Sequence, residues 1–311
     1  MTAISRVVTR FTAGLVHAYD FSGSPVESAA APVAVFPIVE TVELESHAVA
    51  PDLRRAVYGT ADEMVCTDRE GKTLWRFGFG PGAEEPYNAA SCEFSLDGTV
   101  VWVYRPDAMS GRGDGLDHWL AVDAETGGVV AQAELDCAGH GGHQFVHPDG
   151  VHMLLDVGEG QDGSRVYRGR LDRDVIDLTA YPWSDRSLVG LAPDGHRFMT
   201  VHHDQEDVAF HAYPDGEVLV RIPVESFGYD PDEAFVEWTG GYLDADNAIV
   251  TIGGETADEQ EWYRHHLVDV RTGQVHGTLD AQSRDAYDVE PLGDGSWLST
   301  DHDDRLCRHT R

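Results

Sequence analysis

Six short corner signals recur along this sequence at nearly even spacing, and they constrain its fold more than any other feature. Each corner contains an aspartate, and successive aspartates lie 45, 52, 45, 52 and 48 residues apart. A period of this size, with a strand-like run before and after each corner, is typical of a β-propeller built from four-stranded blades. The corners are Pro51-Asp52, Asp97-Gly98, Pro148-Asp149-Gly150, Pro193-Asp194-Gly195, Asp246-Asn247 and Asp294-Gly295.

The segment from His47 to Phe77 shows what one repeat contains. Short apolar runs alternate with turns rich in Gly, Pro and Asp, which indicates antiparallel strands. No window keeps the 3.6-residue apolar period of a helix, so the chain is predicted to be all-β. The same order recurs in Cys92–Leu135, Gln144–Leu178, Leu188–Ile222 and Phe235–Leu279, and a last unit opens at Tyr287 and stops after its third strand, Arg305–Cys307.

The number of blades depends on the first forty residues, where Val7–Phe11, Leu15–Asp20 and Val33–Phe36 resemble strands. These three runs can form a compact seventh blade. Alternatively, Val7–Phe11 completes the truncated C-terminal blade, which would remove an exposed strand edge. We expect seven blades, with six as the alternative. Because no linker-like segment interrupts the repeat, residues 1–311 are expected to form a single propeller domain.

The charge of the chain is strongly negative. It has 22 Lys and Arg residues against 55 Asp and Glu residues, a net charge of −33. Such a surface repels phosphate backbones and anionic lipids, so neither nucleic acid nor a membrane is an expected partner. A cationic ligand or a basic partner suits this charge, although acidity also serves solubility.

Cysteine usage and the N-terminal sequence point to the cytoplasm. The four cysteines are scattered without a CxxC pair, so neither a zinc ribbon nor a secreted disulfide framework is indicated. The first twenty residues contain Arg6, Arg10 and His17 and lack the apolar run of a signal peptide. No stretch approaches the roughly 18–20 apolar residues of a membrane span.

One segment carries a family resemblance. Leu267–Val275, with its Val268-Asp269 pair and its Thr272-Gly273 turn, resembles a WD40-type repeat and its YVTN-like relatives. Val122-Asp123 also stands where the family has Trp-Asp, a dipeptide that this sequence lacks. Gly139-His140 resembles the Gly-His that opens a WD40 repeat. The resemblance implies a propeller that assembles complexes, and the missing signature leaves open a more distant group that includes enzymes.

Histidines form the most distinctive set of candidate site residues, with sixteen in the chain. In the blade interpretation, several open onto one mouth of the central channel. Histidine with carboxylate is a ligand set for zinc, iron or manganese, and histidine is the usual general base near neutral pH. The candidates for a ligand or partner face are His47, His140, His143, His202, His203, Asp204, Trp262 and His302, of which His143, His202 and His302 would be the metal ligands if a metal is bound.

A structural role for these histidines is the competing hypothesis, and pH sensing is a third. In WD40-like blades the histidine at the start of the repeat often stabilises the blade by hydrogen bonding to a hydroxyl and to an aspartate in the next turn. His203-Asp204 and His302-Asp303 fall where such turn residues belong, and no dedicated metal spacing such as HExxH is present.

Other chemistry is poorly supported, since the sequence has no GxSxG motif and no phosphate-binding loop before a helix. Trp262-Tyr263 is the better aromatic candidate for recognition, whereas Trp75, Trp102, Trp119 and Trp297 are expected to pack between blades. The sequence therefore predicts an intracellular binding or scaffold propeller that recognises a protein or small ligand at the His-rich mouth. The alternative is a propeller enzyme, a metal-assisted lyase, hydrolase or isomerase. No cofactor is predicted, a divalent metal ion remains an option, and no catalytic residue is assigned.

Overall fold

The structure of the protein is a computed structural model that describes residues 7–23, 28–38, 44–82, 89–256, 258 and 260–311. By its internal contacts the chain divides into two compact units. The first comprises Met1–Gly23 and Pro32–Ser184, and the second comprises Ser24–Ala31 and Asp185–Arg311. Short segments of α-helix and 3-10 helix occur at Asp107–Ser110 (α1), Gly160–Asp162 (η1) and Val224–Phe227 (η2). None of the helices in the described ranges is long and apolar enough to cross a bilayer.

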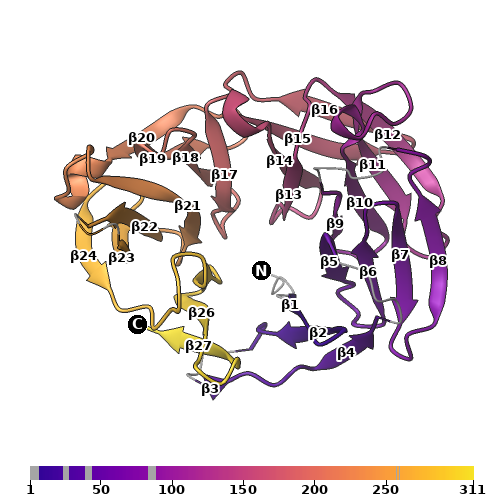
Figure 1. Ribbon diagram of the computed structural model, residues 1–311, viewed down its shortest axis with the longest axis horizontal. Helices are drawn as coiled ribbons and strands as arrows, with labels where there is room; N and C mark the ends of the chain where they lie inside the picture. Colours follow the sequence, from indigo (N-terminus) through magenta and orange to yellow (C-terminus); the bar gives the residue numbers. More distant parts are fainter. Residues whose placement is uncertain (1–6, 24–27, 39–43, 83–88, 257, 259) are drawn as a thin grey trace. The chain divides into compact units, whose positions relative to one another are not determined.

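The first unit contains four antiparallel sheets (Figure 1). One sheet has three strands in the described residues, and the other three have four strands each in simple up-and-down order. The strands are β1 (Val7–Thr12), β2 (Leu15–Asp20) and β4 (Ala34–Pro37); β5 (Ser46–Val49), β6 (Arg55–Gly59), β7 (Glu63–Asp68) and β8 (Thr73–Gly78); β9 (Ser91–Phe94), β10 (Val100–Arg105), β11 (Asp117–Asp123) and β12 (Val129–Leu135); and β13 (Gly141–Val146), β14 (His152–Gly158), β15 (Ser164–Asp172) and β16 (Val175–Ala180).

The second unit contains three antiparallel sheets of four strands each. Two of them again follow the chain in order. The strands are β17 (Arg186–Leu191), β18 (Arg197–His202), β19 (Asp207–Ala212) and β20 (Val218–Pro223); β21 (Ala234–Tyr242), β22 (Asn247–Glu255), β23 (Glu261–Asp269) and β24 (Val275–Leu279); and β25 (Glu290–Pro291), β26 (Ser296–Thr300), β27 (Leu306–Thr310) and β3 (Ser28–Ala29).

These seven sheets of the described chain are the blades of a seven-bladed β-propeller. The predictions of an all-β chain and of seven rather than six blades are both confirmed. The six corners predicted six of the blades, and the strand-like runs of the first forty residues predicted the seventh.

The fourth strand of the C-terminal sheet is β3, from the N-terminal part of the chain. Ala29 lies opposite Cys307, and the Ala30 N–H donates to the Leu306 carbonyl at 2.7 Å. The suggestion that Val7–Phe11 completes this sheet is wrong, because β1 pairs along its whole length with β2. The other alternative, a compact seventh blade containing Val7–Phe11, is confirmed. A two-residue strand of Ser and Ala carries no alternating apolar signal, so it escaped the sequence interpretation.

The corner turns between the first and second strands share one hydrogen bond. In all six predicted corners an aspartate Oδ1 accepts from the backbone N–H two residues later, at 2.8–3.1 Å. This contact closes an Asx turn and fixes the start of the second strand. In the fifth corner the acceptor is Asp244, not the predicted Asp246. The six acceptors are Asp52, Asp97, Asp149, Asp194, Asp244 and Asp294.

Within each unit, neighbouring sheets pack through their apolar faces. Trp75 is buried between the β5–β8 and β9–β12 sheets, where its Nε1 donates to the Ala124 carbonyl at 3.1 Å. Trp102 and Trp119, with ring centroids 4.8 Å apart, belong to the core between the β9–β12 and β13–β16 sheets. Trp297 is buried in the corresponding core of the second unit. These tryptophans therefore pack between blades, as the sequence predicted.

The β3 strand can be tested by removing one donor. Ala30→Pro deletes the N–H that bonds to the Leu306 carbonyl, and Ala30→Ser keeps it. We expect the proline variant to lose about 1–3 kcal/mol of unfolding free energy and the serine variant less than about 0.5 kcal/mol. Urea unfolding measures both. Equal midpoints for the proline variant and the wild type would contradict the assignment of β3 to the C-terminal sheet.

Candidate functional site

The three predicted face histidines of the first unit differ in their surroundings. His47 lies on β5, half-buried, with its ring edge-on to Phe11 at 6.4 Å between centroids. Burial, and then the nearby charge of Arg10, lower its pKa. His140 and His143, at the start of the β13 segment, are exposed. A structural blade histidine is expected to hydrogen-bond to a hydroxyl and an aspartate. Among the hydrogen bonds of the described chain, neither His47 nor His143 makes such a contact.

The predicted face residues of the second unit fall into two groups. His202 ends β18, and His203 and Asp204 follow it; His202 Nδ1 accepts from the Asp204 N–H at 3.1 Å, and the His203 ring stacks on Trp238 at 6.0 Å. His302, by contrast, is exposed and lines a cavity of about 350 Å³ beside β26 and β27. A metal held by His143, His202 and His302 stays a prediction.

Three other histidines make the hydroxyl contacts that the structural hypothesis expected. His211 is fully buried on β19, with Nε2 2.8 Å from Thr200 Oγ1 and Nδ1 3.0 Å from the Gly216 carbonyl. On β23, His265 lies between Thr251 Oγ1 at 2.9 Å and Ser283 Oγ at 2.8 Å. In the third sheet of this unit, His309 Nε2 lies 2.8 Å from Ser299 Oγ. Each sheet of the second unit is thus tied internally by one third-strand histidine.

An aromatic and acidic pocket is the most ligand-like feature of the second unit. It has a volume of about 460 Å³ and lies between β21, β23 and the segment that precedes β25. Trp238 and Tyr287 stand open to solvent on its rim, 42% and 56% exposed. The lining residues are Gln205, Phe235, Glu237, Trp238, Gly254, Glu255, Glu261, Trp262, Tyr263, Asp285, Ala286 and Tyr287. Trp262 is the one residue of the predicted face that lines it.

A bulge in β21 exposes the pocket's central side chains. Val236 pairs with Ile252 and Gly240 with Val250, so three residues of β21 stand opposite one of β22. Such an insertion leaves residues unpaired and redirects their side chains. The Trp238 Nε1 donates to the His202 carbonyl at 3.3 Å, which fixes this indole beside the β18 end.

Two glycines on β22 make room for the pocket wall. A Cβ at Gly253 would lie 2.3 Å from Glu237 Oε1, and a Cβ at Gly254 would lie 2.5 Å from the Trp262 ring. Both approaches are closer than any side chain tolerates. The pair Gly253-Gly254 therefore lets the carboxylate and the indole lie against the strand.

Carboxylates give the pocket its electrostatic character. The Tyr287 hydroxyl donates to Glu237 Oε2 at 2.9 Å. Burial raises the pKa of Glu237, the Tyr287 bond opposes that shift, and the charge of Glu261 adds to it. Burial and the Glu237 contact raise the pKa of Tyr287 to about 12, so this hydroxyl stays a donor. A cation would relieve the crowding of negative charge here.

The aromatic residues beside the pocket already hold a cation of the chain itself. The Arg264 guanidinium lies 5.6 Å from the Trp262 ring centroid and 6.0 Å from that of Tyr229. Tyr229 and Trp262 pack against each other at 5.1 Å. This arrangement is a cation–π contact at an exposed site, and it shows the affinity of this aromatic group for positive charge.

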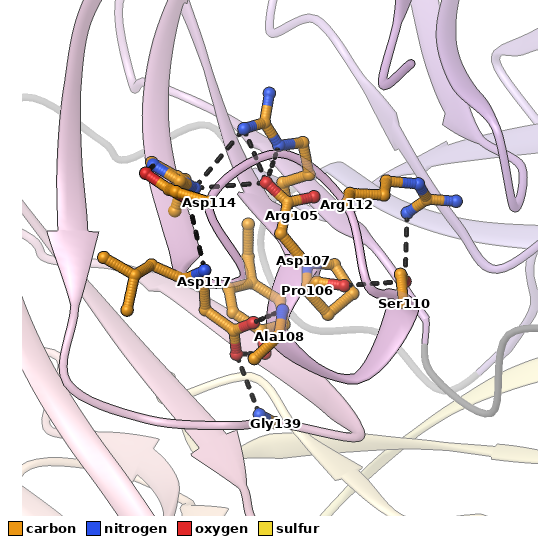
Figure 2. Close-up of polar contacts among 12 residues, drawn as sticks. Arg105, Pro106, Asp107, Ala108, Ser110, Arg112, Asp114, Asp117 and Gly139 are labelled. Carbon is orange, nitrogen blue, oxygen red and sulfur yellow. Dashed lines mark hydrogen bonds and ion pairs between the residues drawn. The ribbon is translucent and has the colours of Figure 1, made fainter. Parts of the chain in front are cut away.

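A buried charged cluster in the first unit is the second candidate (Figure 2). Asp107 lies in α1 and accepts from Arg105 Nε at 2.6 Å. The same carboxylate oxygen is 3.1 Å from His118 Nδ1. An imidazole held by a carboxylate is a common acid–base arrangement. Here the Arg105 guanidinium, 3.3 Å from His118 Nδ1, pairs with the same Asp107 oxygen, so these contacts hold α1 against β10 and β11.

Asp117, at the start of β11, anchors the same loop. Its carboxylate is fully buried and accepts from the Ala108 N–H at 2.9 Å and the Gly139 N–H at 2.8 Å (Figure 2). It also accepts from the Tyr104 hydroxyl at 2.8 Å. Burial, followed by the charge of Asp117, raises the pKa of Tyr104. The sequence interpretation missed this cluster, although the Asp117-His118 pair that opens the apolar run Trp119–Val122 is a usable signal.

Comparison with known proteins supports the fold. No protein-family model matches the sequence, and no curated protein matches it significantly. Among solved structures, the Kuenenia stuttgartiensis hydrazine synthase is 13% identical, with a TM-score of 0.58 over 96% of this chain and 92% of that one. The Dos1 propeller is 8% identical, with a TM-score of 0.57 over 98% and 83%. At these identities the likeness shows the β-propeller fold alone.

The buried His211 predicts a dependence of stability on pH. Burial lowers the pKa of His211 to about 4, against about 6.5 in an unfolded chain. Below pH 6.5 the unfolded state therefore binds a proton that the folded state rejects, and stability falls as pH drops toward 4. His211→Gln should flatten the curve by roughly 1.4 kcal/mol per pH unit in that range.

Urea unfolding at several pH values between 5 and 7 measures this slope. His276→Gln, at an exposed position of β24, is the control and should keep the wild-type slope. An unchanged slope in His211→Gln would contradict the assignment of His211 as a buried neutral group.

Proposed function

We propose that this protein is an intracellular binding module that recognises a positively charged group in the aromatic and acidic pocket of its second unit. The group belongs to a partner protein or to a small ligand. One observation carries this proposal: the described lining combines four carboxylates with exposed aromatic rings and contains no Lys, Arg or His. A negative ligand would meet only like charge there, whereas a cation meets opposite charge and π faces.

The aromatic rings favour a weakly hydrated cation. Trp238 and Tyr287 offer exposed ring faces beside Trp262, and ammonium groups that carry methyl substituents lose less hydration when they bind such faces. Glu237 and Glu261 add the charge that holds the cation. The net charge of −33 extends this preference beyond the pocket, since it steers basic partners toward the protein over a distance set by salt.

Part of the predicted His-rich face borders this pocket. Trp238 contacts both the His203 ring and the His202 carbonyl, and Gln205 of the same turn lines the pocket. We therefore place the partner surface of the second unit at the β18–β19 turn and the pocket beside it. A bound peptide would insert its cationic side chain into the pocket and lie across His202, His203 and Asp204.

Titration with tetramethylammonium tests the pocket directly. Isothermal titration calorimetry of the full chain should detect saturable binding, and the uncharged isostere neopentyl alcohol should bind at least about tenfold more weakly. Trp238→Ala should weaken tetramethylammonium binding by about tenfold, because it removes a cation–π face, and Glu237→Gln by about threefold to tenfold.

Trp183→Ala is the matched control, because Trp183 is a half-exposed tryptophan of the first unit that packs on Tyr181. It should bind tetramethylammonium like the wild type. Equal affinity for the cation and its neutral isostere, or no loss in Trp238→Ala, would contradict the proposed function.

A further inference from the structure

We propose that the corner between β13 and β14 is a binding site for a divalent transition metal ion such as Zn²⁺. Its ligands are His147, Asp149 and His152, whose candidate donor atoms all lie within 4.8 Å of one another. The site lies in the first unit and is independent of the aromatic and acidic pocket of the second unit.

The hairpin places both imidazoles on the same side. The His147 N–H donates to the His152 carbonyl at 3.0 Å, one step beyond the Val146–Met153 pair, so the two histidines stand directly opposite each other. Side chains of opposed residues project to the same face of a sheet. Asp149, in the turn between them, directs Oδ2 at both rings.

The donor separations suit a metal ion without large movement. Asp149 Oδ2 lies 3.0 Å from His147 Nδ1 and 2.7 Å from His152 Nδ1. Ligands at about 2.0–2.2 Å from a zinc ion are themselves roughly 3–3.5 Å apart. Binding requires both Nδ1 atoms to be free of protons, and the 3.2 Å contact from the Asp149 N–H to His147 Nδ1 gives way to the metal.

The turn itself does not need these histidines. Asp149 Oδ1 accepts from the Val151 N–H at 2.8 Å, the same bond that closes the other five corners. Those corners form without histidine at the two positions that correspond to His147 and His152. Two residues before the aspartate they carry Ala50, Ser95, Ala192, Tyr242 and Leu292, and three residues after it they carry Arg55, Val100, Arg197, Asn247 and Trp297. The second carboxylate oxygen and the two imidazoles are therefore additions at this corner.

Burial and access are those of a ligand site. The His147 side chain is 4% exposed and fixed, while Asp149 and His152 are 35% and 26% exposed, so an ion can reach them from solvent. Arg170 pairs with His152 across the strands, but its guanidinium is engaged by Asp177 at 3.2 Å. The other ligand-type trio of the described chain, Asp114, His118 and Glu134, has the Arg105 guanidinium beside its histidine, which opposes a metal ion.

The donor set defines the class of metal. Two imidazole nitrogens and one carboxylate oxygen favour Zn²⁺, Co²⁺ or Ni²⁺ over Mg²⁺ and Ca²⁺, which prefer oxygen ligands. Three protein ligands leave a fourth position for water or for a group of a bound molecule.

Zinc titration of the chelator-treated full chain tests the site. Calorimetry should show one Zn²⁺ per chain, and Co²⁺ should bind with the visible absorption of a nitrogen-ligated ion. Asp149→Asn keeps the Oδ1 acceptor of the turn and replaces Oδ2 by an amide that cannot ligate. Asp149→Asn and His152→Gln should each weaken Zn²⁺ binding by at least about tenfold.

The matched control is Asp97→Asn, the same change in a corner that has no histidine from Ser95 to Val100, and it should bind Zn²⁺ like the wild type. Urea unfolding of the metal-free variants checks that each is folded. No saturable Zn²⁺ binding below about 100 μM, or wild-type affinity in folded Asp149→Asn and His152→Gln, would overturn the proposal.

Discussion

One carboxylate contact, repeated six times, organises this chain. At each corner an aspartate Oδ1 accepts from the N–H two residues later and so fixes where the second strand begins. Register follows from that point, because a slip of one residue would exchange the two faces of the second strand, and with them the neighbouring sheets on which its side chains pack. In β10, for example, Val101–Tyr104 are buried, and the neighbouring sheets of the unit pack on them. The interblade tryptophans depend on the same register.

The proposed functions lie where the repeat departs from its own pattern. In β21 a bulge places three residues opposite one, and the glycines of β22 leave space for Glu237 and Trp262. At the corner from His147 to His152 the turn bond to Asp149 Oδ1 is kept, and two histidines are added beside Asp149 Oδ2. At that corner the turn bond from the Val151 N–H to Asp149 Oδ1 is made without the two histidines.

The sequence predicted the strands, the corners and the interblade tryptophans because each depends on local pattern. The histidines that the sequence analysis considered as structural lie at or near turns. His211, His265 and His309 instead lie within third strands, and the hydroxyl that each contacts belongs to the neighbouring second strand, which the sequence around the histidine does not show. Strand β3 is too short to show a period. The bulge in β21 could not be predicted for a different reason: it is defined by which residues of β22 lie opposite β21, and the sequence of β21 alone does not give that pairing. Trp262 was anticipated as a recognition residue, but Trp238 and Glu237 needed the fold to bring them beside it.

The indole N–H resonances of the seven tryptophans offer the most direct test of whether the aromatic and acidic pocket binds a cation. During titration with tetramethylammonium, two-dimensional ¹⁵N–¹H spectra should show saturable shifts for Trp238 and Trp262. Four buried tryptophans serve as internal controls, and their indole resonances should not shift: Trp75, Trp102, Trp119 and Trp297. Shifts that spread equally over all the indoles, or Trp238 and Trp262 resonances that do not move at saturating cation, would contradict the account.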